Sequence, residues 1–291
     1  MKVTATVVLY NPDDDVYDNI MSYAKNLEFI IIVDNSTNHN IKLINKIKTD
    51  IPKIIYINNN ENLGIATALN IGCKKAIECG SDWVLTMDQD SKILNFTSYL
   101  QCLEKLINTD NIAILAANTM WNATEEMIKG DICKFEEKFL VITSANLLNL
   151  SLFDTIGGFE EKLFIDMVDH DYCIRAQKEN FKILWFENII VNHSLGNLFQ
   201  RKNLITGKIR NKIEHNPQRV YYITRNYLYT WKQYGKLFPK EFNLLKTLNI
   251  LFIHEMTKIF LYEDQKLKKI QAKFLGLYHF LRGKYGKYDF K

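Results

Sequence analysis

The chain has 291 residues, of which 47% are hydrophobic and 24% are charged, and this composition is ordinary for a globular protein with a large core. Its five cysteines are an odd number without paired spacing, which argues against a disulfide framework or a zinc site and favours a reducing cytosol. The N-terminus lacks a signal-peptide pattern and no apolar run is long enough to span a membrane, so we expect neither feature.

The net charge of +4 is unevenly distributed along the chain. Residues 201–291 carry 20 Lys and Arg against 6 Asp and Glu, whereas the preceding residues carry 17 against 27. Basic segments of this kind bind the phosphates of nucleic acid or of anionic lipid headgroups. The basic part lacks a nucleic-acid-binding motif, so we expect no nucleic-acid partner.

Strand-like and helix-like segments alternate in the first part of the chain. Apolar or β-branched runs predict strands at 2–10, 29–33, 53–57 and 83–90. Helical spacing between these runs predicts helices at 16–27, 41–48 and 65–79. This alternation is typical of βαβ units, so we expect an α/β fold with a mainly parallel sheet flanked by helices.

The later segments continue this pattern and then become helical. We expect helices at 96–107 and from about residue 169, and strands at 112–117, 139–144 and 181–186. The remaining segments are an aromatic helix, a strongly apolar stretch and a basic stretch, at 218–234, 242–261 and 266–287. The sequence therefore suggests an α/β domain at 1–205 and a basic, aromatic helical region at 206–291.

Two carboxylates, Asp88 and Asp90, end the apolar run that begins at Trp83. In an extended chain, residues two apart point to the same side, so these carboxylates would converge. Like charges this close repel unless a cation lies between them, and oxygen ligands suit Mg²⁺ or Mn²⁺, which also bind substrate phosphates. A solvated turn after a strand is the alternative that the pair alone leaves open.

Polar residues also follow the earlier predicted strands. Ligands collect at the carboxyl ends of parallel strands, so we expect these residues on one edge of the sheet. The sequence contains neither a dinucleotide-binding glycine motif nor a P-loop. The residues in question are Asn11, Asp34, Asn35, Asn62 and Gly64.

A second acidic cluster consists of Asp166, Asp169 and Asp171. One of them would suit proton abstraction from a hydroxyl, because nearby acids raise the pKa of a carboxylate. The alternative is that Asp169 or Asp171 caps a helix, since acidic residues are favoured in a first helical turn. His193 follows an apolar run, where it is either a structural hydrogen-bonding group or a third metal ligand beside two carboxylates.

The C-terminal region offers a phosphate contact and a membrane contact. Arg225 lies in the aromatic helix, where it would reach a phosphate or lie on a solvated face. Residues 266–287 interleave Lys with Leu, Phe and Tyr, which is typical of a helix in a membrane interface. A homodimer or domain-packing surface is the alternative.

The order and spacing of these motifs resemble the inverting glycosyltransferases of family 2, and most closely their bacterial rhamnosyltransferase branch. The resemblance extends over residues 3–231. The matching segments are VVLYN, IIIVDNS, ENLGIATALNIG, LTMDQDS, GGF, FIDMVDHDYCIRA, HSLG and YYITRNYLY.

This resemblance implies a GT-A fold with a C-terminal helical extension and a role for each site residue. Asp88 and Asp90 would hold Mn²⁺ or Mg²⁺ on a nucleotide diphosphate, and His193 would complete the metal site. Asp169 aligns with the usual general base, but Val168 replaces a glutamate, and Asp166 and Asp171 leave the choice of base open. The residues expected to contact the nucleotide are Asn11, Asp34 (at the pyrimidine ring), Asn35, Asn62, Gly64 and Asp88.

The resemblance also implies an activity, an acceptor and a location. The protein would transfer rhamnose from dTDP-rhamnose, or another sugar from a UDP-sugar, to a glycan or polyprenyl-linked acceptor during bacterial surface polysaccharide synthesis. It would act in the cytoplasm or on the inner face of the cell membrane. The alternatives are a phosphatase of the haloacid dehalogenase type, which also has an Asp-x-Asp strand end, and a non-catalytic sugar-nucleotide-binding protein.

Overall fold

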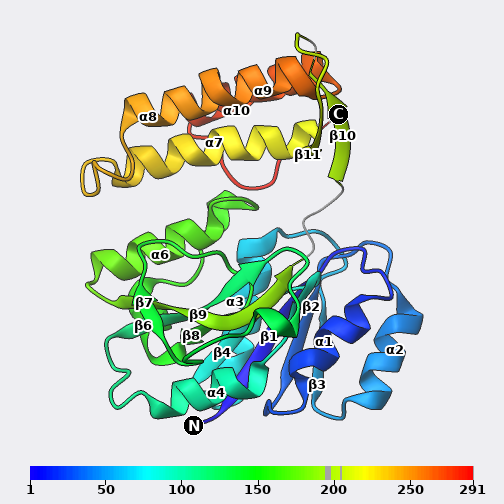
Figure 1. The fold of residues 1–291 in the computed structure, drawn as a ribbon, viewed down its shortest axis with the longest axis vertical. Helices are drawn as coiled ribbons and strands as arrows, with labels where there is room; N and C mark the ends of the chain where they lie inside the picture. Colours follow the sequence, from blue (N-terminus) through cyan, green and yellow to red (C-terminus); the bar gives the residue numbers. More distant parts are fainter. Residues whose placement is uncertain (194–197, 204, 291) are drawn as a thin grey trace. The chain divides into compact units, whose positions relative to one another are not determined.

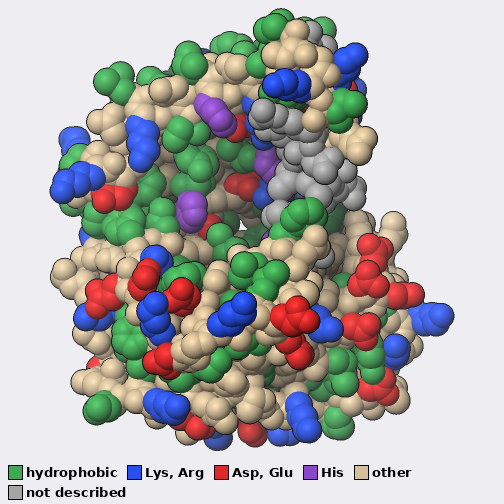
Figure 2. Space-filling model, viewed as in Figure 1, with side chains coloured by type: hydrophobic (Ala, Val, Ile, Leu, Met, Phe, Trp, Pro, Cys, Tyr) green, Lys and Arg blue, Asp and Glu red, His purple; other side chains and the backbone are tan. Residues whose placement is uncertain are grey.

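A computed structural model of the chain describes residues 1–193, 198–203 and 205–290 (Figure 1). The contacts between residues group the chain into two units, one of residues 1–160 and 169–194, the other of residues 161–168 and 195–291. The predicted division at residue 205 stays a prediction, and the short segment 161–168 folds with the C-terminal residues. Acidic and basic side chains are interspersed on the face of the first unit in Figure 2.

The first unit contains a mixed sheet that, in the described part of the chain, has nine strands. The strand order is β3-β2-β1-β4-β8-β6-β9-β5, with β7 paired to β9. Parallel pairs join β3 to β2, β2 to β1, β1 to β4 and β6 to β9, whereas β8 runs antiparallel to β4 and β6. The strands are β1 (Val3–Leu9), β2 (Ile30–Asp34), β3 (Ile54–Asn58), β4 (Trp83–Asp88), β5 (Ser91–Ile93), β6 (Ile112–Met120), β7 (Phe135–Glu137), β8 (Asn146–Asn149) and β9 (Lys182–His193).

Helices flank this sheet, which confirms the predicted fold class of a mainly parallel sheet covered by helices (Figure 1). α3 packs against β1 and β2, while α1 packs against α4 and β5. The α-helices are α1 (Val16–Ala24), α2 (Ile41–Asp50), α3 (Ile65–Glu78), α4 (Phe96–Lys105), α5 (Phe153–Ile156) and α6 (Val168–Lys178), and short 3-10 turns lie at Glu125–Met127 and Leu150–Leu152. A further 3-10 turn, Glu161–Leu163, belongs to the second unit.

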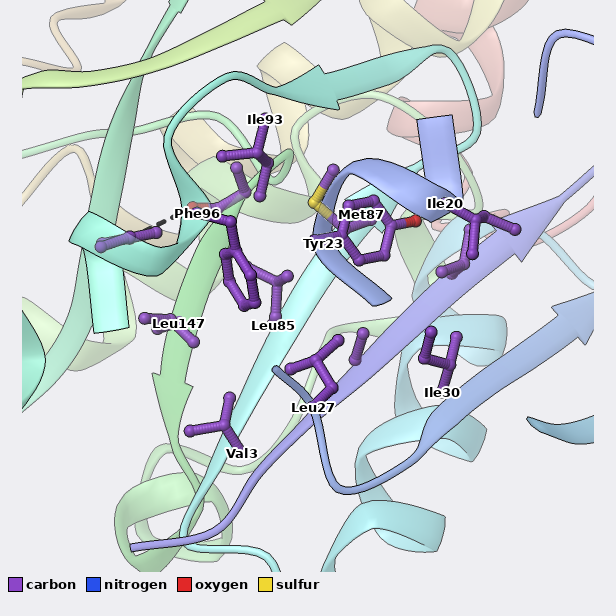
Figure 3. Packing of buried hydrophobic residues seen from close by; sticks show 14 of the residues in the cluster. Val3, Ile20, Tyr23, Leu27, Ile30, Leu85, Met87, Ile93, Phe96 and Leu147 are labelled. Carbon is purple, nitrogen blue, oxygen red and sulfur yellow. Dashed lines mark hydrogen bonds between the residues drawn. The ribbon is translucent and has the colours of Figure 1, made fainter. Parts of the chain in front are cut away.

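Alternation along β1 divides its side chains between two layers. Val3 and Val7 belong to the core cluster that includes residues of α1 and α4, as Figure 3 shows for Val3, Tyr23 and Phe96. Burial of each large apolar side chain contributes about 1.5–3 kcal/mol. Thr6 lies on the opposite face, and a β-carbon at Gly72 of α3 would come within 1.8 Å of its hydroxyl oxygen. Gly72 therefore allows α3 to approach the sheet closely.

Several predicted strands were wrong in their extent or position. No strand forms at 139–144 in the described structure, and Ala145 has a φ of +61° that interrupts the extended backbone before β8. The apolar runs on either side of Glu187 and Asn188 form one strand, β9, rather than a strand that ends at Phe186. These pairings join distant residues, which local periodicity does not show.

The second unit combines a hairpin with packed helices (Figure 1). The prediction of an entirely helical region at 206–291 was wrong at β11, which pairs with β10. α10 packs along α7, and Gly276 permits this approach because a β-carbon there would lie 2.8 Å from the carbonyl oxygen of Tyr221. The elements are β10 (Leu198–Lys202), β11 (Ile209–Ile213), α7 (Pro217–Tyr234), α8 (Leu244–Leu248), a π-helix (Asn249–His254), α9 (Glu255–Tyr262) and α10 (Lys266–Leu281).

The cysteines differ from the prediction that they form no disulfide. Cys102 of α4 is bonded to Cys133, which lies 31 residues further along the chain. Cys102 is on the buried side of α4, and Cys133 packs against the same core cluster. This bond removes the cysteine-based argument for a reducing compartment. Across the residues described, no helix has both the length and the apolar character needed to cross a membrane.

Candidate functional site

Two carboxylates and an imidazole converge at one edge of the sheet in the first unit. Asp88 ends β4, Asp90 lies in the following turn, and His193 ends β9. Each offers a ligand atom, and these atoms all lie within 4.8 Å of one another. All three residues are half-buried, so the cluster is partly open to solvent.

The turn between Asp88 and Asp90 is fixed by Gln89. Its side-chain oxygen accepts a hydrogen bond from the backbone nitrogen of Tyr10 at 2.8 Å, and its amide nitrogen donates to the Tyr10 carbonyl at 3.3 Å. The turn is thereby attached to the end of β1. The two carboxylates converge as predicted, but through this turn rather than through a continuous extended strand.

His193 reaches the cluster through strand pairing. β5 pairs with β9 so that Ser91 is opposite His193, and the Ser91 hydroxyl lies 2.7 Å from His193 Nδ1. The same nitrogen is 3.4 Å from Asp90 Oδ1. The remainder of the HSLG motif, Ser194–Gly196, lies outside the described residues.

The donor set suits a divalent cation. Two carboxylates held this close repel each other, and a cation between them would remove that repulsion. Carboxylate oxygens are ligands for Mg²⁺ and Mn²⁺, and imidazole is a common additional ligand for transition metals. Asp88, Asp90 and His193 therefore fit the ion that the resemblance implies.

Asp34 lies at the end of β2 with its carboxylate fully buried. It accepts hydrogen bonds from the backbone nitrogen of Ser36 at 2.8 Å and the Tyr56 hydroxyl at 2.7 Å, and it lies 3.0 Å from His39 Nδ1. Burial by itself would raise the pKa of Asp34, but the hydrogen bonds from Ser36, Tyr56 and His39 outweigh it, and the pKa is lowered. Asp34 is thus held as a carboxylate.

This burial changes the role that the resemblance gives to Asp34. A carboxylate without exposed surface has no room for a pyrimidine ring, whereas the His39 side chain is 21% exposed. His39 Nε2 lies 3.2 Å from the Asn58 amide nitrogen at the end of β3. Sequence analysis did not single out His39 or Tyr56. The only sequence feature that could have indicated a role for His39 is its position five residues after Asp34.

Asn35 and the loop before α3 are joined by hydrogen bonds. The buried Asn35 amide donates to the carbonyl of Gly64 at 3.0 Å and accepts from Asn59 at 2.8 Å. Asn62 accepts a hydrogen bond from the Gly64 backbone nitrogen at 2.9 Å, and Gly64 has a φ of +88° where α3 begins. Glycine suits this conformation because it lacks a β-carbon. Asn35 therefore supports the loop from within.

Asn11 lies just beyond β1 and is exposed. Its φ is +47°, and its backbone nitrogen donates a hydrogen bond to the Ser36 hydroxyl at 2.7 Å. This bond connects the residues that follow β1 and β2. The polar residues after the first strands thus lie at the carboxyl edge, as predicted.

Of the three candidate bases, Asp171 is a structural residue. It is completely buried, and its Oδ2 lies 2.8 Å from both Nε and Nη2 of Arg175. Arg175 also donates hydrogen bonds to the carbonyls of Ile156 and Gly158, so the pair holds the Gly157 turn against α6. A buried ion pair of this kind stabilises only while both partners remain.

Asp166 belongs to the second unit and is also paired. Arg219 of α7 lies 3.1 Å from its carboxylate through Nε and through Nη2. The segment around Asp166 is strained, because Phe164, Asp166 and Met167 have φ values of +60°, +63° and +66°. The amide of Asn226 holds this backbone by donating to the carbonyls of residues 163, 165 and 166.

Asp169 lies in the first turn of α6 and is half-buried. Its Oδ1 accepts a hydrogen bond from the backbone nitrogen of His170, at 2.8 Å. It also borders a small cavity of about 10 Å³, beside Thr86 and Asn146. That volume holds at most about one water molecule, so a sugar would approach Asp169 from another side.

Arg225 does not have either of its predicted roles, because it is neither on a solvated face nor available to a phosphate. It is 1% exposed. Its guanidinium donates hydrogen bonds to the Gly286 carbonyl at 2.8 Å, the Tyr221 hydroxyl at 3.2 Å and the Lys162 carbonyl at 3.2 Å. Arg225 therefore joins three segments of the second unit.

Comparison with known proteins gives a family match across the sheet. The model of glycosyl transferase family 2 matches residues 7–157, which is more than half of the chain. The match includes Asp34, Asp88 and Asp90 and ends before Asp169. The chain is also 27% identical over 242 residues to the dTDP-rhamnosyl transferase RfbF of Shigella flexneri, covering 77% of this chain and 78% of that protein.

Solved structures give the same result for the fold. The chain resembles the mannosyltransferase PcManGT from Pyrobaculum calidifontis in complex with GDP-Man and Mn²⁺, with a TM-score of 0.57, 12% identity, and coverage of 96% of this chain and 74% of that one. It also resembles residues 1–349 of Staphylococcus aureus TarS in complex with UDP-GlcNAc, with a TM-score of 0.53, 14% identity, and coverage of 99% and 94%. These likenesses confirm the predicted GT-A fold.

Proposed function

The chain belongs to glycosyl transferase family 2, and from this premise we propose that it transfers rhamnose from dTDP-rhamnose to a glycan, with inversion at the anomeric carbon. The observation that carries the proposal is the convergence of Asp88, Asp90 and His193 within 4.8 Å, at the sheet edge that also holds Asp34. Such an edge is where α/β sheets bind nucleotides.

The metal chemistry would be carried by this cluster. A Mn²⁺ or Mg²⁺ ion held by Asp88, Asp90 and His193 would offset the negative charge that develops on the departing diphosphate. Gln89 fixes the turn that carries Asp88 and Asp90, and Ser91 orients the imidazole. These contacts keep the ligand atoms in position before the substrate arrives.

Asp169 is the general base that we propose. Asp171 is engaged by Arg175 in a buried ion pair, and Asp166 is paired with Arg219. Asp169 accepts the hydrogen bond from the His170 backbone through Oδ1, and its carboxylate can accept a proton from an acceptor hydroxyl. The hydroxyl oxygen forms a bond to the sugar C1 as the bond from C1 to the diphosphate oxygen breaks, and the proton passes to Asp169. One displacement inverts the anomeric centre.

His39 is the residue that we propose to recognise the base. The buried Asp34 carboxylate favours a proton on His39 Nδ1, which leaves Nε2 as an acceptor that the pyrimidine would take over from the Asn58 amide. An imide N–H, which thymine and uracil both carry, is a matching donor. Asn11 lies exposed at the same edge, while Asn35, Asn62 and Gly64 shape the loop before α3.

The proposed donor comes from the relative rather than from the site itself. The rhamnose donor rests on the 27% identity to a dTDP-rhamnosyl transferase. We propose that the acceptor is a glycan of a surface polysaccharide, free or carried on a polyprenyl diphosphate. The reaction would then take place in the cytoplasm or at the inner face of the cell membrane.

Calorimetric titration with dTDP-rhamnose, UDP-glucose and GDP-mannose, each with Mn²⁺ and with EDTA, tests the donor and the metal together. We expect the tightest binding for dTDP-rhamnose with Mn²⁺ and at least a tenfold weaker binding with EDTA. Binding of every donor that is unchanged by EDTA would overturn the metal site. Preference for another sugar nucleotide would overturn the rhamnose donor while leaving the transferase intact.

A phosphatase assay and a transfer assay with acceptor glycan distinguish the two alternative functions. A phosphatase would hydrolyse a phosphate monoester without affinity for sugar nucleotides, and its nucleophilic Asp would be expected on the first strand, whereas Asp88 ends β4. A non-catalytic binding protein would bind the donor without releasing dTDP when acceptor glycan is present. Either outcome would replace the proposed reaction.

A further inference from the structure

The helix α10 has an unusual distribution of side chains. Leu267, Phe274, Tyr278 and Leu281 are 77%, 54%, 48% and 71% exposed. Their spacing places all four on one side of the helix. They form an apolar stripe along the outer side of α10.

The inner side of α10 carries polar and charged groups. Lys269 and Lys273 are each 1% exposed, and His279 is also buried. Lys269 pairs with Glu214 and with Glu263, while His279 Nδ1 lies 2.8 Å from the Tyr221 hydroxyl. The helix therefore buries two lysines beside Ala272 and Phe280 and exposes several large apolar side chains, unlike an ordinary surface helix.

The stripe continues onto the neighbouring helices. Phe274 lies 6.4 Å from the ring of Phe252, and Lys266 Nζ lies 5.6 Å from the ring of Phe260. Ile253 and Phe260 are themselves 64% and 60% exposed. Figure 2 shows hydrophobic side chains on the surface of the second unit. We call the following set the apolar face: Leu267, Phe274, Tyr278 and Leu281.

Basic side chains border the apolar face. Residues 266–287 contain seven Lys and Arg and no Asp or Glu. Lys268 and Arg282 are exposed beside the stripe, and the Arg282 guanidinium lies 5.6 Å from the Tyr278 ring. The surface thus combines exposed apolar groups with the exposed cations Lys268 and Arg282.

We propose that the apolar face inserts into an anionic lipid surface, with Lys268 and Arg282 at the headgroups. Apolar side chains on an interfacial helix enter the boundary between headgroups and acyl chains, and nearby cations strengthen binding to an anionic leaflet. The inference deepens the proposed function, because it rests on that function for the idea that the acceptor is lipid-linked, but the lipid contact itself requires no transfer.

A second copy of the chain fits this surface less well. Antiparallel two-fold association would bring the apolar face against itself, and with it Lys268 of one copy against Arg282 of the other. Juxtaposed like charges oppose such a contact. Anionic headgroups instead complement the charge beside the stripe.

Sedimentation with vesicles tests the proposal on the purified full-length chain, without donor or acceptor. Vesicles of phosphatidylcholine with phosphatidylglycerol should bind the protein, and binding should weaken as salt rises. The triple variant Leu267→Ser, Phe274→Ser, Leu281→Ser should bind about a hundredfold more weakly, since each position loses a buried apolar side chain. Ile107→Ser, at a fully exposed apolar residue of the first unit, is the matched control and should bind normally.

Several outcomes would overturn the proposal. These are vesicle binding that is unchanged in the triple variant, equal binding to vesicles of phosphatidylcholine alone, or a dimer in analytical ultracentrifugation that the triple variant abolishes. Thermal melting and dTDP binding verify that the triple variant is folded. Vesicle binding by a chain that transfers no sugar would support the lipid proposal and overturn the proposed function. Sugar transfer by a chain that does not bind vesicles would support the proposed function and overturn the lipid proposal.

Discussion

Polar side chains have opposite roles in the two units of this protein. In the first unit, Asp88, Asp90 and His193 lie half-buried at the carboxyl edge of the sheet, where a ligand can reach them. In the second unit, Arg225 and Lys273 are buried among helices, and apolar side chains are outside. The position of a charge in the fold, rather than the number of charges in a segment, therefore indicates what it binds.

The difference follows from how the backbone polar groups of each unit find hydrogen-bond partners. A parallel sheet leaves its strand ends free, so side chains placed there are available for chemistry. The second unit instead holds a strained segment, 161–168, whose carbonyls need donors. Arg225 and Asn226 supply them. Mutations of the strand-end side chains in the first unit should change catalysis. Mutations of the buried donors in the second unit should change stability.

The largest effect that we expect is on the metal site. Asp88→Asn with Asp90→Asn removes both carboxylate charges, so the transfer rate should fall by about 10⁴-fold, equivalent to several kcal/mol of lost transition-state stabilisation. Transfer assays with Mn²⁺ measure the rate, and calorimetry measures loss of the ion. Glu104→Gln, an exposed acid on α4, is the control and should retain the activity. Normal transfer by the double variant would mean that Asp88 and Asp90 take no part in the reaction.

Asp169→Asn should have the next largest effect. Loss of a general base lowers kcat by about 10²–10⁴-fold, while donor binding and melting temperature should remain unchanged. Asp171→Asn provides the contrast, because it leaves Arg175 buried without its carboxylate and should destabilise the protein by about 3–5 kcal/mol. If Asp169→Asn melted early and Asp171→Asn only slowed transfer, the two roles would have to be exchanged.

Arg225→Met should act on stability alone. The carbonyls of Lys162 and Gly286 would each lose a donor, at a cost of about 1–3 kcal/mol per buried group. Urea unfolding measures the loss, and donor affinity below the unfolding transition should be unchanged. Arg219→Met, at a half-exposed arginine of the same helix, should cost about 1 kcal/mol or less. If the folded Arg225→Met variant bound the donor more weakly, the original prediction that Arg225 contacts a phosphate would be supported.

Lys273→Met should have the smallest effect and the opposite sign. Burial lowers the pKa of Lys273 to about 8, and its ammonium lies 3.5 Å from the Thr224 hydroxyl. An apolar side chain of similar length should therefore stabilise the protein by about 1–3 kcal/mol at pH 7.

The pH dependence of unfolding checks the same lysine. The folded-state pKa is depressed below the usual value near 10.4, so the unfolded chain binds more protons between the two values. The stability of the natural chain should rise as the pH increases from about 8 to about 10.5, and the advantage of Lys273→Met should shrink over that interval. An advantage that is constant with pH would mean that Lys273 is not penalised by burial.

Much of the first unit could be predicted from sequence, because buried parallel strands are continuous apolar runs. Ile30–Asp34 and Trp83–Asp88 are of this kind, and each ends in the polar residues that form the site. The convergence of Asp88 and Asp90 was predicted from alternation in an extended strand, whereas in the structure a turn fixed by Gln89 brings them together. His39 was missed because its partner, the buried Asp34 carboxylate, is defined by contacts with β3 that the local sequence does not encode.

The second unit was harder to predict for a related reason. Helical periodicity marks a stripe as apolar, but it does not say whether that stripe faces inward. The Lys-rich pattern at 266–287 suggested a basic surface, whereas Lys269 and Lys273 are inside. Cys102 and Cys133 were likewise too far apart in sequence for their bond to be recognised.

The segment 161–168 has a practical consequence for anyone who wishes to study the units separately. The chain leaves the first unit after Glu160, returns at Asp169 and leaves again after residue 194. A single protease cut or an early stop codon therefore cannot release the catalytic unit intact. A fragment that ends at residue 194 would keep 161–168 but lose the α7 donors that hold it, so dissecting this enzyme requires a short replacement loop rather than truncation.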